Sequence, residues 1–182
     1  MSALDRSGGI LVQRMVNARA AGVLHTLSTT AGQGREMVVN VGLGLGEGVV
    51  SGLVEVDHIV VSREGDFDSG PLRFRYLVGD KGSRMVFDRR AGGGTRLEET
   101  LYHQRLRPAL EYADLLDLVR CAARCEETYR LPLDLEFALE EDALYILQAR
   151  PIAAYLATAR EARRTDVLSG SVLPSRAREE NS

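Results

Sequence analysis

The chain has 182 residues, of which 45% are hydrophobic and 27% charged, a composition typical of a globular protein with one domain and at most a short appendage. The formal net charge of −3 gives no electrostatic reason to expect nucleic-acid binding, and no apolar stretch approaches the roughly 20 residues that span a bilayer. The first nine residues lack the apolar segment of a signal peptide, so we expect a cytoplasmic protein without nucleic-acid or membrane partners.

Short apolar runs of strand length fill the first half of the chain. The predicted strands are Ile10 to Val16, Gly22 to Thr26, Glu36 to Val41, Glu55 to Ser62, Arg73 to Val78 and Arg84 to Phe87. Glycine-rich, turn-forming segments separate these runs, and the pattern therefore predicts a meandering sheet and not a helical bundle.

A run of alternate glycines follows the third predicted strand, in the segment Val41 to Gly52. Its spacing is neither the dinucleotide fingerprint GxGxxG nor the phosphate loop GxxxxGK, so neither of those folds is supported. Glycines here would let the backbone approach a ligand closely, with Glu47 held at the end of the loop. A plain turn or bulge explains the same glycines equally well.

The second half of the chain begins with helical periodicity from Pro108 to Tyr129. Two strands follow, Leu133 to Leu139 and Leu144 to Arg150, and a short acidic loop joins them into a hairpin. Beyond Pro151 we expect a short helix to about residue 164 and then a polar, disordered tail.

The register of this hairpin follows from the need to keep one face apolar. The apolar residues that alternate along its first strand are Leu133, Leu135, Phe137 and Leu139. Placing Glu136 opposite Gln148 keeps that face apolar, because Phe137 then meets Leu147. The remaining pairs of this register are Asp134 with Arg150, Ala138 with Ile146 and Leu139 with Tyr145.

The other face of the hairpin would carry two carboxylates, an amide and a guanidinium within reach of one another. Carboxylate and amide oxygens are hard ligands that suit Mg²⁺, and a planar guanidinium binds phosphate bidentately. A nucleoside triphosphate with its metal matches this set. A solvated strand face with a surface ion pair worth about 0 to 1 kcal/mol matches it as well, and the chemistry of the side chains leaves both interpretations open.

Six motifs occur in a characteristic order between Gly9 and Ile152: LVQRMV, AAGVLHT, VVNVGLGLGEGVVSG, GDK, AGGGT and LDLEFAL…LYILQARP. In this order they resemble the ATP-binding domain of the pyruvate phosphate dikinase and phosphoenolpyruvate synthase family, which rifampicin phosphotransferases share. The resemblance implies an α+β fold, the C-terminal half of an ATP-grasp domain, with a largely antiparallel sheet, a long helix and a C-terminal β-hairpin. This half domain would cover residues 1–152, and residues 153–182 would form the short helix and the disordered tail.

Carried over residue by residue, the resemblance also implies a metal and phosphate site. Glu136 and Gln148 match the carboxylate and the amide that hold Mg²⁺ in the family. Arg150 matches the catalytic arginine beside the phosphates. The implied cofactors are therefore ATP and Mg²⁺.

The remaining nucleotide contacts implied by the resemblance lie earlier in the chain. Gln13, with the backbone of Met15 and Val16, matches the hinge that reads the adenine. Glu47 belongs to the GLGE motif. Lys81, the only lysine in the sequence, stands where the family has its I-G-x-K lysine, and it is grouped with the nucleotide-binding residues without a specific role.

The sequence departs from the family pattern in three respects. His25 replaces a phenylalanine, and Leu43 replaces a tryptophan. The first ATP-grasp half, the phosphohistidine domain and the pyruvate-binding barrel have no counterpart in the 182 residues. We therefore expect a part of an ATP-dependent phosphotransferase that is inactive alone and is completed by a separate chain carrying the N-terminal half and the phosphohistidine domain.

Two other hypotheses are compatible with the same residues. The chain could be a non-catalytic remnant that binds only a nucleotide or a protein. It could also belong to a rifampicin phosphotransferase, because the residues that select the phosphoryl acceptor lie outside this segment in the family. The sequence does not separate that hypothesis from a phosphoenolpyruvate synthase.

Overall fold

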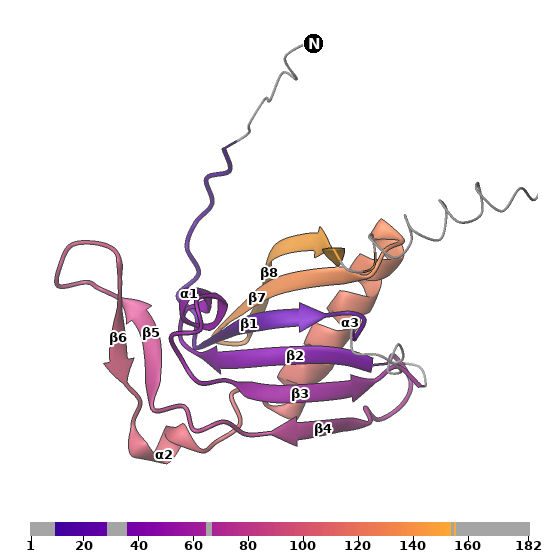
Figure 1. Ribbon diagram of the computed structural model, residues 1–182, viewed down its shortest axis with the longest axis horizontal. Coiled ribbons are helices and arrows are strands. Elements are labelled where there is room, and N and C mark those ends of the chain that lie inside the picture. The colour runs from indigo at the N-terminus through magenta and orange to yellow at the C-terminus, as the bar shows by residue number, and fades with distance from the viewer. Residues whose placement is uncertain (1–9, 29–35, 65–66, 154, 156–182) are drawn as a thin grey trace, which may run out of the picture.

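The computed structural model describes residues 10–28, 36–64, 67–153 and 155. Its main sheet has six strands in the order β4-β3-β2-β1-β7-β8, each antiparallel to its neighbours (Figure 1). These strands are β1 (Ala20–His25), β2 (Glu36–Leu43), β3 (Asp57–Ser62), β4 (Phe74–Leu77), β7 (Leu133–Glu140) and β8 (Ala143–Pro151). The first four form the predicted meander, and the predicted β7–β8 hairpin extends the sheet on the other side of β1, so the α+β prediction is confirmed.

One face of this sheet is covered by α3 (Tyr112–Tyr129), which lies behind the sheet in Figure 1. The helix begins four residues later than predicted, because Glu111 is its N-cap: its side chain accepts a backbone N–H bond, and the Asp114 carboxylate accepts one from Glu111 at 2.9 Å. The core between helix and sheet consists of alternate strand residues and one helix stripe, including Leu24, Val39, Ile59, Leu115, Leu118, Val119, Leu135 and Phe137.

A separate hairpin of β5 (Ser83–Phe87) and β6 (Thr95–Glu99) stands at the end of the main sheet beside α1 (Gly46–Val50). The glycine run explains how it docks. Gly44 has φ +82°, and a Cβ there would lie 2.1 Å from the Met85 carbonyl oxygen of β5. The next residue, Leu45, donates its backbone N–H to that oxygen at 2.8 Å. The missing side chain of Gly44 therefore lets β5 of the same chain approach the backbone closely.

The predicted strand from Ile10 to Val16 is wrong. This segment has no strand pairing with the described residues, and the exposed fractions of Ile10, Leu11 and Val12 are 94%, 81% and 89%. A strand needs a neighbour, and the segment pairs neither with β1, whose two sides are occupied by β2 and β7, nor with the edge strands β4 and β8. Only Val16, at the end of the segment, is buried.

Three short elements escape the sequence pattern, namely α1, β6 and α2 (Tyr102–Arg105). The strand β6 has a single apolar residue, Leu97, so no alternation marks it. The helix expected to about residue 164 falls mostly outside the described residues, and the polar tail falls entirely outside them. Within the part of the chain that the structure describes, no helix is long and apolar enough to cross a membrane.

The β7–β8 register agrees with the prediction at one end and differs at the other. Glu136 lies opposite Gln148, as predicted, but a β-bulge follows and Phe137 faces Ile146 instead of Leu147. The predicted pairs beyond the bulge are likewise replaced by Ala138 with Tyr145 and Leu139 with Leu144. The sequence could not reveal the bulge, because residues 144–147 are all apolar and carry no alternation.

Candidate functional site

The sheet face opposite α3 is open except at one end, where α1 lies (Figure 1). Strand pairing aligns two rows of side chains across this face. The first row is Leu77, His58, Asn40, Val23, Glu136 and Gln148, and the second is Arg75, Val60, Val38, His25, Asp134 and Arg150. None of these residues is buried, and the predicted Glu136, Gln148 and Arg150 therefore share one accessible face.

A pocket of about 320 Å³ lies at the α1 end of this open face. Three separate elements contribute predicted residues to its lining: the segment before β1, the helix α1 and the strand β7. These residues are Gln13, Met15, Val16, Glu47 and Glu136. The rest of the lining combines apolar side chains such as Ala138 and Leu147 with Arg14 and Thr95, and apolar walls with a small number of polar groups are typical of a small-molecule site.

Polar groups continue from this pocket along the β7–β8 hairpin. Gln148 is exposed and lies directly across from Glu136. About 7 Å further along β7, the Asp134 carboxylate accepts a 2.8 Å hydrogen bond from Arg150 Nε. Asp134 Oδ1 has no hydrogen-bond partner among the described residues, and His25 Nε2 lies 3.5 Å from it. The Glu136 carboxylate, the Gln148 amide and the Arg150 guanidinium therefore extend from the pocket along the β7–β8 hairpin.

The sequence matches the protein family described as pyruvate phosphate dikinase, AMP/ATP-binding domain, over residues 2–168. The chain belongs to this family. The matched range includes all the residues that line the pocket and those that follow it on β7 and β8.

Curated relatives carry the same segment inside much longer proteins. Rifampicin phosphotransferase of a Streptomyces species is 35% identical over 144 residues, which cover 79% of this chain and 16% of that protein. Phosphoenolpyruvate synthase of Pseudomonas aeruginosa is 34% identical, with coverages of 77% and 18%. A probable phosphoenolpyruvate synthase of Methanocaldococcus jannaschii is 32% identical, with coverages of 78% and 11%. The chain thus spans less than a fifth of the length of these relatives.

Glu47, in the GLGE motif of this dikinase-family domain, has a partner that sequence reasoning missed. Its Oε2 accepts a 2.7 Å hydrogen bond from Thr95 Oγ1, at the start of β6. Thr95 also lines the pocket. The motif AGGGT ends on this threonine, but nothing in its local sequence indicates that the β5–β6 hairpin brings it to α1.

Lys81 is not brought to the pocket, contrary to its grouping with the nucleotide-binding residues. Its side chain is completely buried, and Nζ donates to Asp57 Oδ1 and to the Gly79 carbonyl oxygen. Asp57 is equally buried and accepts three further bonds, from Tyr76 Oη at 2.8 Å and from the backbone N–H groups of Gly79 at 2.8 Å and Ala109 at 2.7 Å. Lys81 therefore joins segments of the fold and has no exposed atom for a nucleotide.

Tyr76 belongs to the same buried network. Burial, together with the hydrogen bond to the negatively charged Asp57, raises the pKa of the Tyr76 hydroxyl above its usual value. The hydroxyl also accepts a bond from the Leu110 backbone N–H at 3.2 Å. The network thus fixes the edge strand β4 to the segment that leads into α3.

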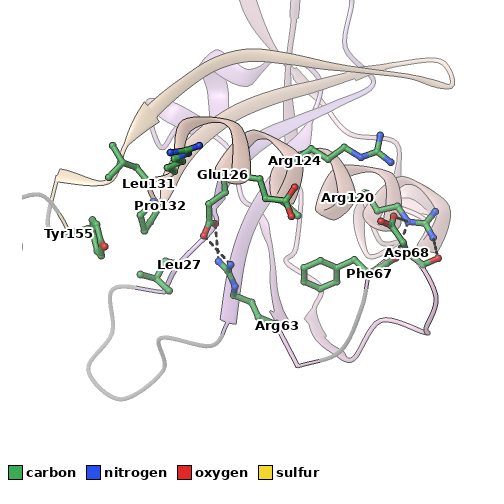
Figure 2. Close-up of a pocket in the computed structure, with 13 residues that line it drawn as sticks. Leu27, Arg63, Phe67, Asp68, Arg120, Arg124, Glu126, Leu131, Pro132 and Tyr155 are labelled. Carbon is green, nitrogen blue, oxygen red and sulfur yellow. Dashed lines mark hydrogen bonds and ion pairs between the residues drawn. The ribbon is translucent and has the colours of Figure 1, made fainter.

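A larger cavity, of about 690 Å³, lies at the C-terminal end of α3 and contains none of the predicted site residues (Figure 2). Several of its charged groups are engaged in bonds within the protein. Arg63 forms two hydrogen bonds with Glu126, at 2.9 and 3.0 Å, and Arg120 donates to the Phe67 carbonyl oxygen at 2.9 Å. Size alone therefore does not identify the functional site, and the residues singled out by the sequence lie in and beside the smaller pocket.

Proposed function

We propose that this chain is the C-terminal half of an ATP-grasp domain and that it binds Mg·ATP on its open sheet face. The observation that carries the proposal is the pocket in which Gln13, Met15 and Val16 meet Glu136, with Gln148 directly opposite on β8. The family match supports a nucleotide with an adenine base. The relatives support phosphoryl transfer as the activity of the whole protein to which such a segment belongs.

The adenine would occupy the end of the pocket lined by the segment before β1. The Gln13 amide provides both a donor and an acceptor for the edge of a base, and the backbone of Met15 and Val16 provides further polar groups. Apolar side chains, including Leu147 on the opposite wall, suit the faces of a planar ring. The base would thus be held by its edge and its faces together.

Glu136 and Gln148 fit the role of Mg²⁺ ligands. Their side chains lie on adjacent strands of the open face, and carboxylate and amide oxygens are the hard donors that Mg²⁺ selects. When bound, Mg²⁺ would neutralise part of the charge on the phosphates. Two protein ligands also suit this ion, because it usually shares its remaining positions among water and phosphate oxygens.

Arg150 would contact the phosphate end of the nucleotide. Its exposed guanidinium is held by Asp134 through Nε, and the two terminal nitrogens, which form no hydrogen bond with the described residues, could donate toward phosphate oxygens. Asp134 would act as a positioning residue that keeps Arg150 extended along the open face. Pocket, metal ligands and arginine would then follow the order of base, metal and phosphates.

The proposal covers the phosphoryl donor, which the relatives named for rifampicin and for phosphoenolpyruvate would share over this segment. The open face would be covered by a second protein unit carrying the N-terminal ATP-grasp half and the phosphohistidine domain. Positioning contributes most of the rate in phosphoryl transfer, so this chain without that unit should bind nucleotide weakly and transfer no phosphate.

Titration of the chain with ATP, in the presence of Mg²⁺ or of EDTA, tests the proposal by nuclear magnetic resonance or thermal shift. Wild-type protein should bind saturably with Mg²⁺. Glu136→Ala should weaken binding roughly tenfold or more with Mg²⁺ and much less in EDTA, because one charged ligand is lost. Glu127→Ala, on the exposed surface of α3, is the matched control and should bind like wild type.

Two results would contradict the proposal. The first is the absence of any response to Mg·ATP, even when the unit that carries the N-terminal half is added. The second is a binding curve unchanged by both Glu136→Ala and Arg150→Ala, which would instead favour a remnant without this nucleotide site.

A further inference from the structure

The β5–β6 hairpin forms one wall of the nucleotide pocket through Thr95. The hairpin is docked firmly, because Met85 of β5 bonds to Leu45 and packs at 3.0 Å from the position of a Cβ on Gly48. Its first β6 residue, Thr95, then donates its hydroxyl hydrogen to Glu47 Oε2 at 2.7 Å. This bond fixes one carboxylate oxygen of Glu47 and leaves the other, Oε1, as an acceptor at the pocket.

The charge of Glu47 restricts what this acceptor can bind. No arginine, lysine or histidine forms an ion pair with Glu47 among the described residues, and Arg14, the cation that also lines the pocket, is paired with Glu140 at 3.6 Å. A carboxylate in this state repels phosphate and accepts hydrogen bonds from neutral O–H and N–H donors. In a nucleotide these donors are the amine of the base and the hydroxyls of the ribose; the edge of the base is assigned above to the segment before β1, which leaves the ribose hydroxyls for Glu47.

Resting on the function proposed above, we infer that Glu47 binds the ribose hydroxyls and that Thr95 is a positioning residue for its carboxylate. The site would then distinguish ribonucleotides from nucleotides that lack sugar hydroxyls. The β5–β6 hairpin, which stands outside the main sheet, would contribute to this selectivity through a single hydroxyl.

The test compares dissociation constants of ATP and 2′,3′-dideoxy-ATP, both with Mg²⁺, for wild type, Glu47→Ala, Thr95→Val and Thr95→Ser. Wild type should prefer ATP by roughly tenfold, the value of one hydrogen bond to a charged group. Glu47→Ala should abolish the preference. Thr95→Val should reduce it at least threefold, whereas Thr95→Ser, which keeps the hydroxyl, should retain it. Thr128→Val, at an exposed α3 position, is the control for the loss of a threonine hydroxyl.

The preference between the two nucleotides separates positioning from a merely structural role. If Thr95 only stabilised the hairpin, Thr95→Val would weaken both nucleotides equally, and this result would overturn the inference. Equal affinity of wild type for both nucleotides would overturn it as well, while leaving the proposed function intact. If neither nucleotide binds, the proposed function fails and the inference fails with it.

Discussion

Replacing Lys81 by methionine removes the ammonium group that lies against the completely buried carboxylate of Asp57. Loss of one partner from a buried ion pair destabilises proteins by about 3–5 kcal/mol, because the remaining charge is left without compensation. Asp57 keeps three other donors, from Tyr76, Gly79 and Ala109, which stabilise its negative charge in part. We therefore expect a loss near 3 kcal/mol, which lowers the melting temperature of a domain of this size by about 6–12 °C.

Urea unfolding at pH 7, followed by far-ultraviolet circular dichroism, measures this loss. Arg124→Met, on the exposed surface of α3, is the matched control and should change the free energy of unfolding by less than about 0.5 kcal/mol. Adding Asp57→Asn to Lys81→Met should recover part of the stability, since the uncompensated charge disappears. A Lys81→Met protein as stable as wild type but deficient in ATP binding would refute this reasoning and return Lys81 to the nucleotide site.

Two further predictions concern the docking of the hairpin and the buried network. Gly44→Ala should lower the free energy of unfolding by at least about 1–3 kcal/mol, because of the positive φ and the contact of the added Cβ with Met85. Gly93→Ala, where a Cβ would have open space around it, should lower it much less. Chemical denaturation measures both losses, and equal losses would contradict the docking argument. Because the Tyr76 pKa is raised, the folded protein retains this proton above about pH 10 while the unfolded chain releases it, so stability is full below that pH and falls as the pH rises. Tyr76→Phe should flatten this alkaline decline in urea midpoints between pH 9 and 11, and an unchanged decline would exclude Tyr76 as its source.

Most strands of the main sheet could be predicted from the sequence, because local apolar runs bounded by turns mark them. The predictions that were wrong concern segments whose structure depends on partners distant in the chain. Ile10 to Val16 has the composition of a strand, yet it pairs with no strand of the sheet, neither beside β1 nor at the edges formed by β4 and β8. Thr95–Glu99 lacks an apolar pattern and becomes a strand only because β5 pairs with it. The start of α3 was misplaced because Pro108 suits a first helical turn, while the cap formed by Glu111 and Asp114 lies further along.

Some parts of the candidate site could be predicted from the sequence alone and others could not. Alternation along β7 led to the pairing of Glu136 with Gln148, which the structure has, but not to the bulge that follows it. The meeting of Gln13 with Glu136 was expected from the family resemblance and not from the spacing of the residues, since only the tertiary fold brings them to one pocket. The position of Lys81 away from the pocket could not be predicted, because burial of a lysine is invisible in its local sequence and its partner Asp57 lies 24 positions away.

Because of the bulge in β8, one residue that lines the pocket takes no part in the pairing of β7 with β8. Leu147 is the extra residue: Gln148 pairs with Glu136 and Ile146 pairs with Phe137, so Leu147 has no partner of its own on β7. Its side chain lines the pocket. Shortening the chain by this single residue would keep every other pair of the ladder and remove only one wall of the cavity. The space that we propose for the base could therefore be resized without disturbing Glu136, Gln148 and Arg150, the groups proposed to contact the metal and the phosphates.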